Sequence, residues 1–150
     1  MSTSLKSRTR TIITRDDGRF LIKVTNRAAE TAPPDRFIVF PGGRVEMDDC
    51  PDEVNRYHLK RDLGVVLLNV VDLGVIRVKL SRSTAFGRSY TLFTAKIDVT
   101  PRIHESRVMK EEFHWVHQEE LSELLVRLNA RYDHGFLECL GVYQKSRRPA

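Results

Sequence analysis

Two adjacent glycines, Gly42 and Gly43, stand a few residues before a stretch that carries His58 and Asp62. A glycine backbone can approach a ligand closely because no side chain intervenes. If the stretch is helical, His58 and Asp62 are one turn apart on one face, beside the glycine turn. An imidazole and a carboxylate in that relation can share one divalent ion. On the residues alone, the alternative that stays open is a polar pair on a solvated helix.

The helix that must position these side chains is predicted over 51–63. Asp49 or Cys50 can cap its start, and Pro51 suits its first turn. Gly64 suits the position just past its end. The glycine turn and the helix are therefore expected to form one loop-helix unit.

The rest of the chain alternates between β-rich and helical patterns. Phe20, Ile22 and Val24 alternate with more polar neighbours, which predicts a strand with one face more buried than the other. The order of the patterns predicts an α/β (α+β) fold in which a sheet packs against helices. We expect strands over 10–14, 19–25, 36–40, 65–76, 90–99 and 113–116, helices over 51–63, 118–129 and 133–144, a turn at 16–18, and loops over 28–35, 81–88 and 101–110.

The composition fits a single globular domain over residues 1–150, with segments 1–8 and 145–150 expected to be flexible. Hydrophobic residues make up 41% and charged residues 30%, which is ordinary for such a domain. No apolar run reaches the roughly 18 residues needed to cross a bilayer, so we expect no membrane span.

The cysteines and the net charge bear on location and partners. Cys50 and Cys139 are far apart and show no metal-ligand spacing, so we expect two reduced thiols and a cytoplasmic location. Lys plus Arg exceeds Asp plus Glu by 25 − 20 = 5, which favours anionic partners such as nucleotides or RNA. Because the basic residues are spread along most of the chain, RNA is the weaker of these two expectations.

The segment from Gly43 to Val65 resembles the Nudix box, whose pattern is G-x5-E-x7-R-E-U-x-E-E-x-G-U with U a bulky apolar residue. Gly43 takes the first position, Leu59 the first U, and Gly64 and Val65 the last two. The spacing holds without a gap. Similarity to the family extends over roughly residues 10–130. The resemblance implies a Nudix-type mixed β-sheet sandwiched between helices.

The positions that carry chemistry in the box differ from the family pattern. Asp49 stands where the first Glu is expected. Tyr57 and His58 replace Arg-Glu, and Arg61 and Asp62 replace Glu-Glu. In Nudix enzymes these glutamates hold Mg²⁺ or Mn²⁺ against a diphosphate and help to activate water. Standard hydrolysis with several glutamate ligands is therefore not expected here.

A single-metal site is what the resemblance implies for this chain. A hard divalent ion prefers oxygen ligands, and Mg²⁺ often takes few protein ligands and keeps its waters. We expect one Mg²⁺ or Mn²⁺ ion held by Asp62 and the backbone carbonyl of Gly42. Glu46 and Asp49 would contribute through water.

The GDP-mannose mannosyl hydrolase branch of the family is the most similar in these motifs. It shares Gly-Gly-Arg-Val and Thr-Asn-Arg, and it cleaves a sugar from a nucleotide with a histidine base from a late loop. The matching stretch here, 109–111, contains no histidine. Another group must therefore act as the base. The catalytic candidates are His58, Glu111 and Glu112, with His104 and His114 as further histidines.

Arginines next to the expected cleft are suited to bidentate contact with phosphate. We expect Arg27 and Arg44, with Gly42 and Gly43, to bind substrate. The predicted function is hydrolysis of a nucleoside diphosphate linked to another moiety, such as a nucleotide sugar. The alternative is a catalytically inactive module that binds nucleotide or RNA, because Arg61 would turn a cation site into a phosphate-binding surface. A homodimer is expected from the family resemblance.

Overall fold

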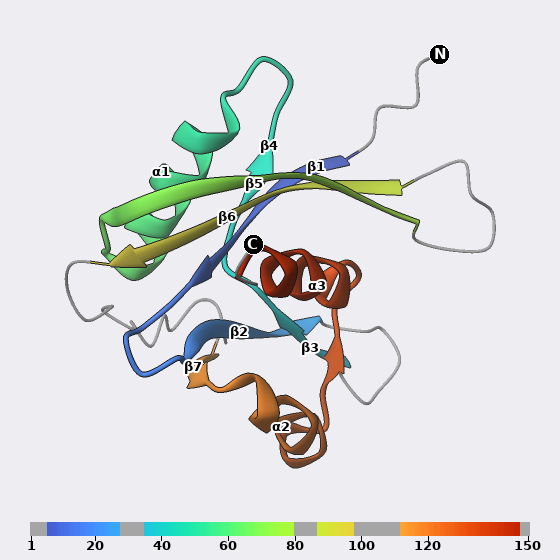
Figure 1. Ribbon diagram of the computed structural model, residues 1–150. Helices are drawn as coiled ribbons and strands as arrows, with labels where there is room; N and C mark the ends of the chain where they lie inside the picture. The colour runs from blue at the N-terminus through green and yellow to red at the C-terminus, as the bar shows by residue number, and fades with distance from the viewer. Residues whose placement is uncertain (1–5, 28–34, 80–86, 98–111, 148–150) are drawn as a thin grey trace.

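The chain is described by a computed structural model that covers residues 6–27, 35–79, 87–97 and 112–147. Apart from two additional strands of two residues each, its strands and helices follow one another in the order expected from the sequence (Figure 1). The elements are β1 (Lys6–Ile13), β2 (Phe20–Arg27), β3 (Asp35–Val39), β4 (Arg44–Val45), α1 (Pro51–Leu63), β5 (Leu67–Lys79), β6 (Gly87–Ile97), β7 (Glu112–Val116), a 3₁₀ turn (Gln118–Glu120), α2 (Leu121–Leu128), β8 (Arg131–Tyr132) and α3 (Phe136–Ser146).

The strands form two mixed sheets, which confirms the predicted α+β class with mixed β-structure and helices. One four-stranded sheet has the order β4-β1-β6-β5 and the other has the order β7-β2-β3-β8. In each sheet one pair is parallel, β1 with β6 and β3 with β8. The chain passes between the sheets at the turn after β1, where an isolated bridge joins Thr14 to Phe20. The predicted turn at 16–18 therefore connects two sheets.

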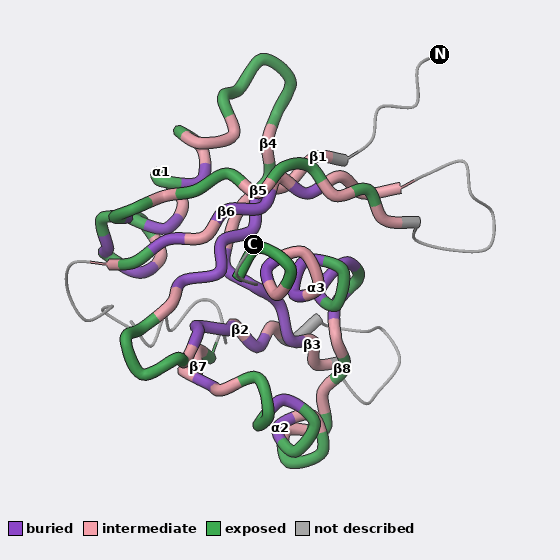
Figure 2. The backbone as a smooth tube through the Cα atoms, in the orientation of Figure 1, coloured by how far each residue is buried: buried purple, intermediate pink, exposed green. Residues whose placement is uncertain are grey.

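Helices cover the sheets from both sides, as predicted. Leu59 and Leu63 of α1 pack in one core cluster with residues from both sheets. Residues of α2 and α3 pack in a second cluster, again with residues from both sheets. Figure 2 shows β1, β2 and β3 buried between these layers. The expected alternation on β2 is present, because Phe20 and Ile22 pack in the second cluster, which contains α2 and α3. The intervening Leu21 is also buried, because it packs in the cluster that contains α1.

The helix α1 begins and ends where the sequence predicted. Pro51 is its first residue, and Gly64 ends it in the left-handed conformation with φ 68°. Cys50 is the N-cap residue but makes no side-chain cap bond, so Asp52 and Glu53 in the first turn supply the negative charge that favours a helix start. The loop-helix unit is therefore set by local signals.

The ends of several other elements differ from the predictions. The strand β1 already begins at Lys6, inside the segment expected to be flexible, because it pairs with β6 from Lys6 onward. Helix α3 extends to Ser146, and β6 begins at Gly87 inside an expected loop. Loop predictions for 28–34, 81–86 and 101–110 lie outside the described residues.

The cysteines occupy different environments. Cys50 is exposed at the start of α1, whereas Cys139 is buried in α3. Burial raises the pKa of the Cys139 thiol to about 12. Both thiols are free, as predicted. Among the described helices, none is long and apolar enough to span a bilayer.

Candidate active site

The glycine turn before α1 is held against the middle of β1. The amide of Thr9 donates to the carbonyl of Gly43 at 2.8 Å, and the amide of Gly43 donates to Thr9 Oγ1 at 3.1 Å. The amide of Thr11 donates to the carbonyl of Pro41 at 2.8 Å. A Cβ atom at Gly42 would overlap the Thr9 carbonyl oxygen and lie 2.7 Å from the Thr9 carbonyl carbon. Glycine is therefore required at position 42 by the closeness of two backbones.

The histidine of the box lies directly on this turn. A Cβ atom at Gly43 would overlap the His58 ring and lie 2.5 Å from its Nε2 atom, so the imidazole lies directly against the glycine backbone. The Tyr57 ring meets the His58 ring edge-on, with centroids 5.6 Å apart. His58 Nδ1 is buried and makes no hydrogen bond within the described part of the chain. The predicted proximity of His58 to the glycine turn is confirmed.

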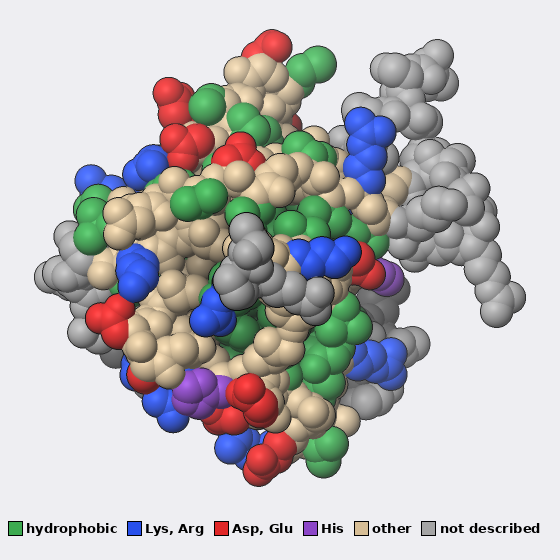
Figure 3. Space-filling model, viewed as in Figure 1, with side chains coloured by type: hydrophobic (Ala, Val, Ile, Leu, Met, Phe, Trp, Pro, Cys, Tyr) green, Lys and Arg blue, Asp and Glu red, His purple; other side chains and the backbone are tan. Residues whose placement is uncertain are grey.

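A pocket lies between the turn, β4 and the start of α1, and we refer to it as the box pocket. Glu46 and Asp49 line it, and the Glu46 amide donates to Asp49 Oδ2 while the Asp49 amide donates to the Glu46 carbonyl, each at 3.1 Å. Acidic side chains gather around this loop at the top of Figure 3. The residues lining the box pocket are Arg44, Glu46, Asp49, Glu53, Val54, Tyr57 and His58.

Asp62 lies near the other end of α1 and does not line the box pocket. Its Oδ1 atom accepts a hydrogen bond from Arg61 Nε at 2.9 Å. This hydrogen bond with Asp62 is the main cause of the raised pKa of Arg61. Arg61 also lies over the Tyr57 ring, 5.7 Å from its centroid. The carboxylate expected to hold a metal is thus engaged by a neighbouring cation.

The donors expected for a divalent ion, Asp62, the Gly42 carbonyl, Glu46 and Asp49, come from the two ends of the box. Within the described part of the chain, no group of three or more His, Cys, Asp or Glu side chains lies close enough to hold an ion. Glu46 and Asp49 line the box pocket, whereas Asp62 pairs with Arg61 and is not among the lining residues. The set Asp62, Gly42, Glu46 and Asp49 stays a prediction, and no chemical step below is assigned to an ion.

The other predicted site residues are spread over the second sheet. Glu112 lies on β7, where its carboxylate pairs with Arg36 at 2.9 Å and His114 at 3.3 Å. It does not line the box pocket. Arg27 ends β2, but its side chain lies outside the described part of the chain. Glu111 and His104 also lie outside it.

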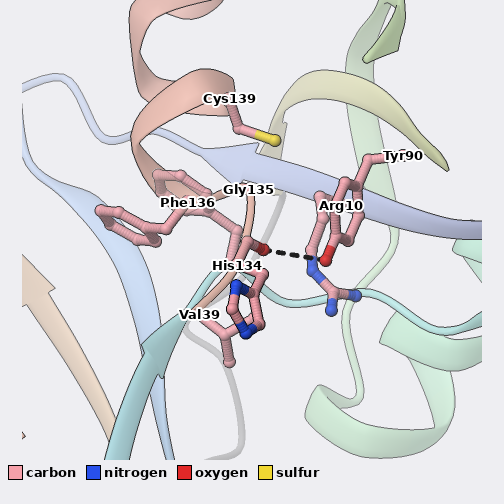
Figure 4. Close-up of a pocket in the computed structure, with 8 residues that line it drawn as sticks. Arg10, Val39, Tyr90, His134, Gly135, Phe136 and Cys139 are labelled. Atoms are coloured by element: carbon pink, nitrogen blue, oxygen red, sulfur yellow. Dashed lines mark hydrogen bonds between the residues drawn. The ribbon is translucent and has the colours of Figure 1, made fainter. Parts of the chain in front are cut away.

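Sequence reasoning missed a charged group beneath α3. Arg10 and Tyr90 extend toward the loop before α3, where the Tyr90 hydroxyl donates to the His134 carbonyl at 2.8 Å (Figure 4). The Arg10 guanidinium carbon lies 5.0 Å from the Tyr90 ring centroid. A signal was present, because Arg10 shares strand parity with the core residue Ile12. A charged residue on the core-facing side of a strand needs a hydrogen-bonding or oppositely charged partner, because burying an unpaired charge is costly.

Comparison with known proteins identifies the fold. No family model and no curated protein matches the chain. Among solved structures, a NUDIX hydrolase from Nitrosomonas europaea matches 97% of this chain and 92% of its own, with TM-score 0.64 and 13% identity. The Escherichia coli ORF135 protein matches over 98% and 96% respectively, with TM-score 0.60 and 20% identity. A MutT NUDIX hydrolase from Burkholderia pseudomallei matches over 77% and 85%, with TM-score 0.56 and 18% identity.

These likenesses show that the chain has the Nudix hydrolase fold. Two of the matches extend over almost the whole chain, so the fold accounts for both sheets and all three helices. The fold expected from the spacing of Gly43, Gly64 and Val65 is therefore confirmed.

Proposed function

We propose that the chain hydrolyses a nucleoside diphosphate linked to another group, such as a sugar, at the box pocket. The observation that carries the proposal is a pocket beside the box turn, lined by Arg44 and by the acidic Glu46, Asp49 and Glu53. A guanidinium can bind two phosphate oxygens at once. The acidic rim would disfavour a bare anion, so it suits a ligand that brings a cation or a neutral polar moiety such as a sugar.

The reaction adds water across the linkage, and the proposed roles follow from position. Arg44 binds phosphate oxygens, and the Gly42-Gly43 backbone lets the substrate approach the turn. The water oxygen forms a bond to the phosphorus or carbon atom on one side of the bridging oxygen, and a base takes the proton of the water. The bond from that atom to the bridging oxygen breaks, and the other group leaves with this oxygen as an anion or takes up a proton. Among the described catalytic candidates His58 is the one that lines the box pocket, and an imidazole nitrogen is a group that can accept a proton. Glu111 and Glu112 remain candidates without a placed role.

A catalytically inactive module that binds nucleotide or RNA is the second candidate. It is favoured by one observation, the ion pair of Arg61 with Asp62 at the position where the fold family carries paired glutamates. If Arg61 binds phosphate at that end of α1, this binding weakens as salt is added, because contacts between basic side chains and phosphates release counterions.

The test is a screen of nucleotide sugars and dinucleotides for turnover, with Mg²⁺, Mn²⁺ or a chelator. We expect His58→Ala to lower kcat by about 100-fold, as removal of a general base does. Asp62→Ala should abolish the part of the rate that depends on the metal. Asp16→Ala is the matched control, since Asp16 is 96% exposed and pairs only at the surface with Lys96.

The outcomes separate the two candidates. Turnover that neither Asp62→Ala nor the chelator changes would contradict the metal prediction. Binding of nucleotide or RNA that weakens with salt, with no turnover of any compound, would support the inactive module instead.

A further inference from the structure

Arginines from two neighbouring strands meet on the α3 face of the first sheet. Arg8 and Arg10 have the same parity on β1, and Arg88 has the parity of Tyr90 on β6. The strands β1 and β6 are parallel, with Arg8 beside Tyr90. We call Arg8, Arg10 and Arg88 the arginine cluster. They share the buried side of the sheet with α3, near Asp133 in the loop before that helix.

The arginine cluster carries more positive charge than Asp133 balances. Arg10 Nη2 lies 3.9 Å and Arg88 Nη1 lies 4.0 Å from the Asp133 carboxylate, both beyond hydrogen-bond distance. The side chains are little exposed, at 9% for Arg10, 14% for Arg88 and 1% for Asp133. Burial first, and then the charge of Arg88, lowers the pKa of Arg8. Among the described residues, this is a partly buried group of like charges with one carboxylate, Asp133, in ion-pair range of Arg10 and Arg88.

Several donors of the arginine cluster also have no protein acceptor. Arg8 Nε, Arg88 Nε and Arg88 Nη1 are buried and make no hydrogen bond within the described part of the chain. Arg10 is better satisfied, since its Nη1 donates to the Thr9 carbonyl at 2.9 Å. Buried donors without acceptors are costly, and charged donors more so. The free donors therefore belong mainly to Arg8 and Arg88.

We propose that the arginine cluster binds a phosphate group, as the dianion of a phosphomonoester or as free phosphate. Guanidinium groups offer paired N–H donors that match phosphate oxygens. Two net positive charges, from three arginines and Asp133, match a dianion. In the structure, Asp133 lies in ion-pair range of Arg10 and Arg88, and the Tyr90 ring lies against Arg10.

The phosphate site adjoins the box pocket without being part of it. The Thr9 carbonyl that accepts from Arg10 is the atom against which Gly42 packs. Arg44, which lines the box pocket, is opposite Arg8 in the β1–β4 ladder. A ligand in the box pocket could therefore place a further phosphate on the arginine cluster. The phosphate site itself does not depend on the proposed hydrolysis.

The experiment measures binding of inorganic phosphate to the intact chain by calorimetry, with acetate and chloride at matched ionic strength. Arg88→Met removes the charge and keeps an apolar stem. Arg77→Met is the matched control, because Arg77 is exposed and pairs with Ser89, the neighbour of Arg88 on the opposite face of the sheet. We expect Arg88→Met to weaken phosphate binding about tenfold or more, and Arg77→Met to change it less than about twofold.

Thermal melting separates loss of binding from loss of folding. Without phosphate, Arg88→Met should melt at or above the wild-type temperature, because the variant removes a like charge from a crowded site. Added phosphate should raise the wild-type melting temperature and leave that of Arg88→Met nearly unchanged. If Arg88→Met does not fold, Asp133→Asn serves instead and should tighten phosphate binding several-fold, since it removes the competing carboxylate.

Three results would overturn the proposal. The first is that the wild type shows no saturable binding of phosphate. The second is that Arg88→Met and Arg77→Met weaken phosphate binding equally. The third is that acetate binds as tightly as phosphate. A free nucleoside monophosphate that binds more tightly than inorganic phosphate, and loses that advantage in Arg88→Met, would assign the site to a phosphomonoester. Because none of these measurements involves turnover, they stand whether or not the chain hydrolyses any compound.

Discussion

Gly42→Ala is expected to lower the free energy of unfolding by about 3 kcal/mol, at the upper end of overpacking effects. The added Cβ would overlap the Thr9 carbonyl oxygen, which belongs to the backbone of β1. The strand β1 cannot move away easily, because it is paired with β4 on one side and β6 on the other. Urea denaturation followed by circular dichroism measures the change.

Gly43→Ala is the informative control for this prediction. Its Cβ would meet the His58 ring, a side chain, and side chains rearrange at lower cost than backbone. We expect a loss of about 1 kcal/mol, partly recovered when His58→Ala is added, as a double-mutant cycle would show. Equal losses for Gly42→Ala and Gly43→Ala would mean that the turn is not held against β1 as described.

Asp133→Ala is expected to destabilise the protein by about 3 kcal/mol, because removing one member of a buried ion pair leaves the other uncompensated. Arg10 and Arg88 both approach this carboxylate, and its side chain is 1% exposed. Adding Arg88→Met should restore part of the loss by reducing repulsion within the arginine cluster. The same denaturation measurement applies to the single and the double variant.

Exposed aspartates provide the comparison for Asp133→Ala. Asp16→Ala should change the free energy of unfolding by no more than about 0.5 kcal/mol, as surface substitutions do. If Arg88→Met lowers the free energy of unfolding further when it is added to Asp133→Ala, the arginines are not repelling one another and another group balances their charges.

The loop-helix unit could be predicted because its signals are local. Pro51 at the first helical position and Gly64 in the left-handed conformation mark both ends within the helix sequence itself. The placement of His58 beside the turn follows from the same local geometry, since a helix beginning at Pro51 brings that side chain back toward Gly43. For this part of the site, spacing along the chain was enough to predict proximity in space.

The division into two sheets could not be predicted in this way. The strands β4 and β8 contain only two residues each and exist through pairing with β1 and β3. Nothing in Arg44–Val45 or Arg131–Tyr132 marks a strand locally. Likewise, the β1–β2 turn has the composition of a hairpin, although the two strands join different sheets.

The charged groups of the site were the least predictable part. Arg8, Arg88 and Asp133 come from three distant segments, and only the parallel pairing of β1 with β6 brings the arginines together. Conversely, Asp62 and Asp49 belong to one motif but have different partners, because the Arg61 side chain donates to Asp62 while the backbone amide of Glu46 donates to Asp49. The motif predicted which residues belong to the site, but it did not predict the groups with which they pair.

The contrast between the two cysteines gives the wild-type chain a built-in attachment point for a spectroscopic reporter. Cys50 is exposed and immediately follows Asp49, which lines the box pocket, so a maleimide fluorophore there would sense changes at that pocket. Cys139 is buried with a pKa of about 12, so it stays protonated and unreactive at neutral pH. Ligand titrations of the box pocket can thus be followed on one labelled protein without first removing a cysteine.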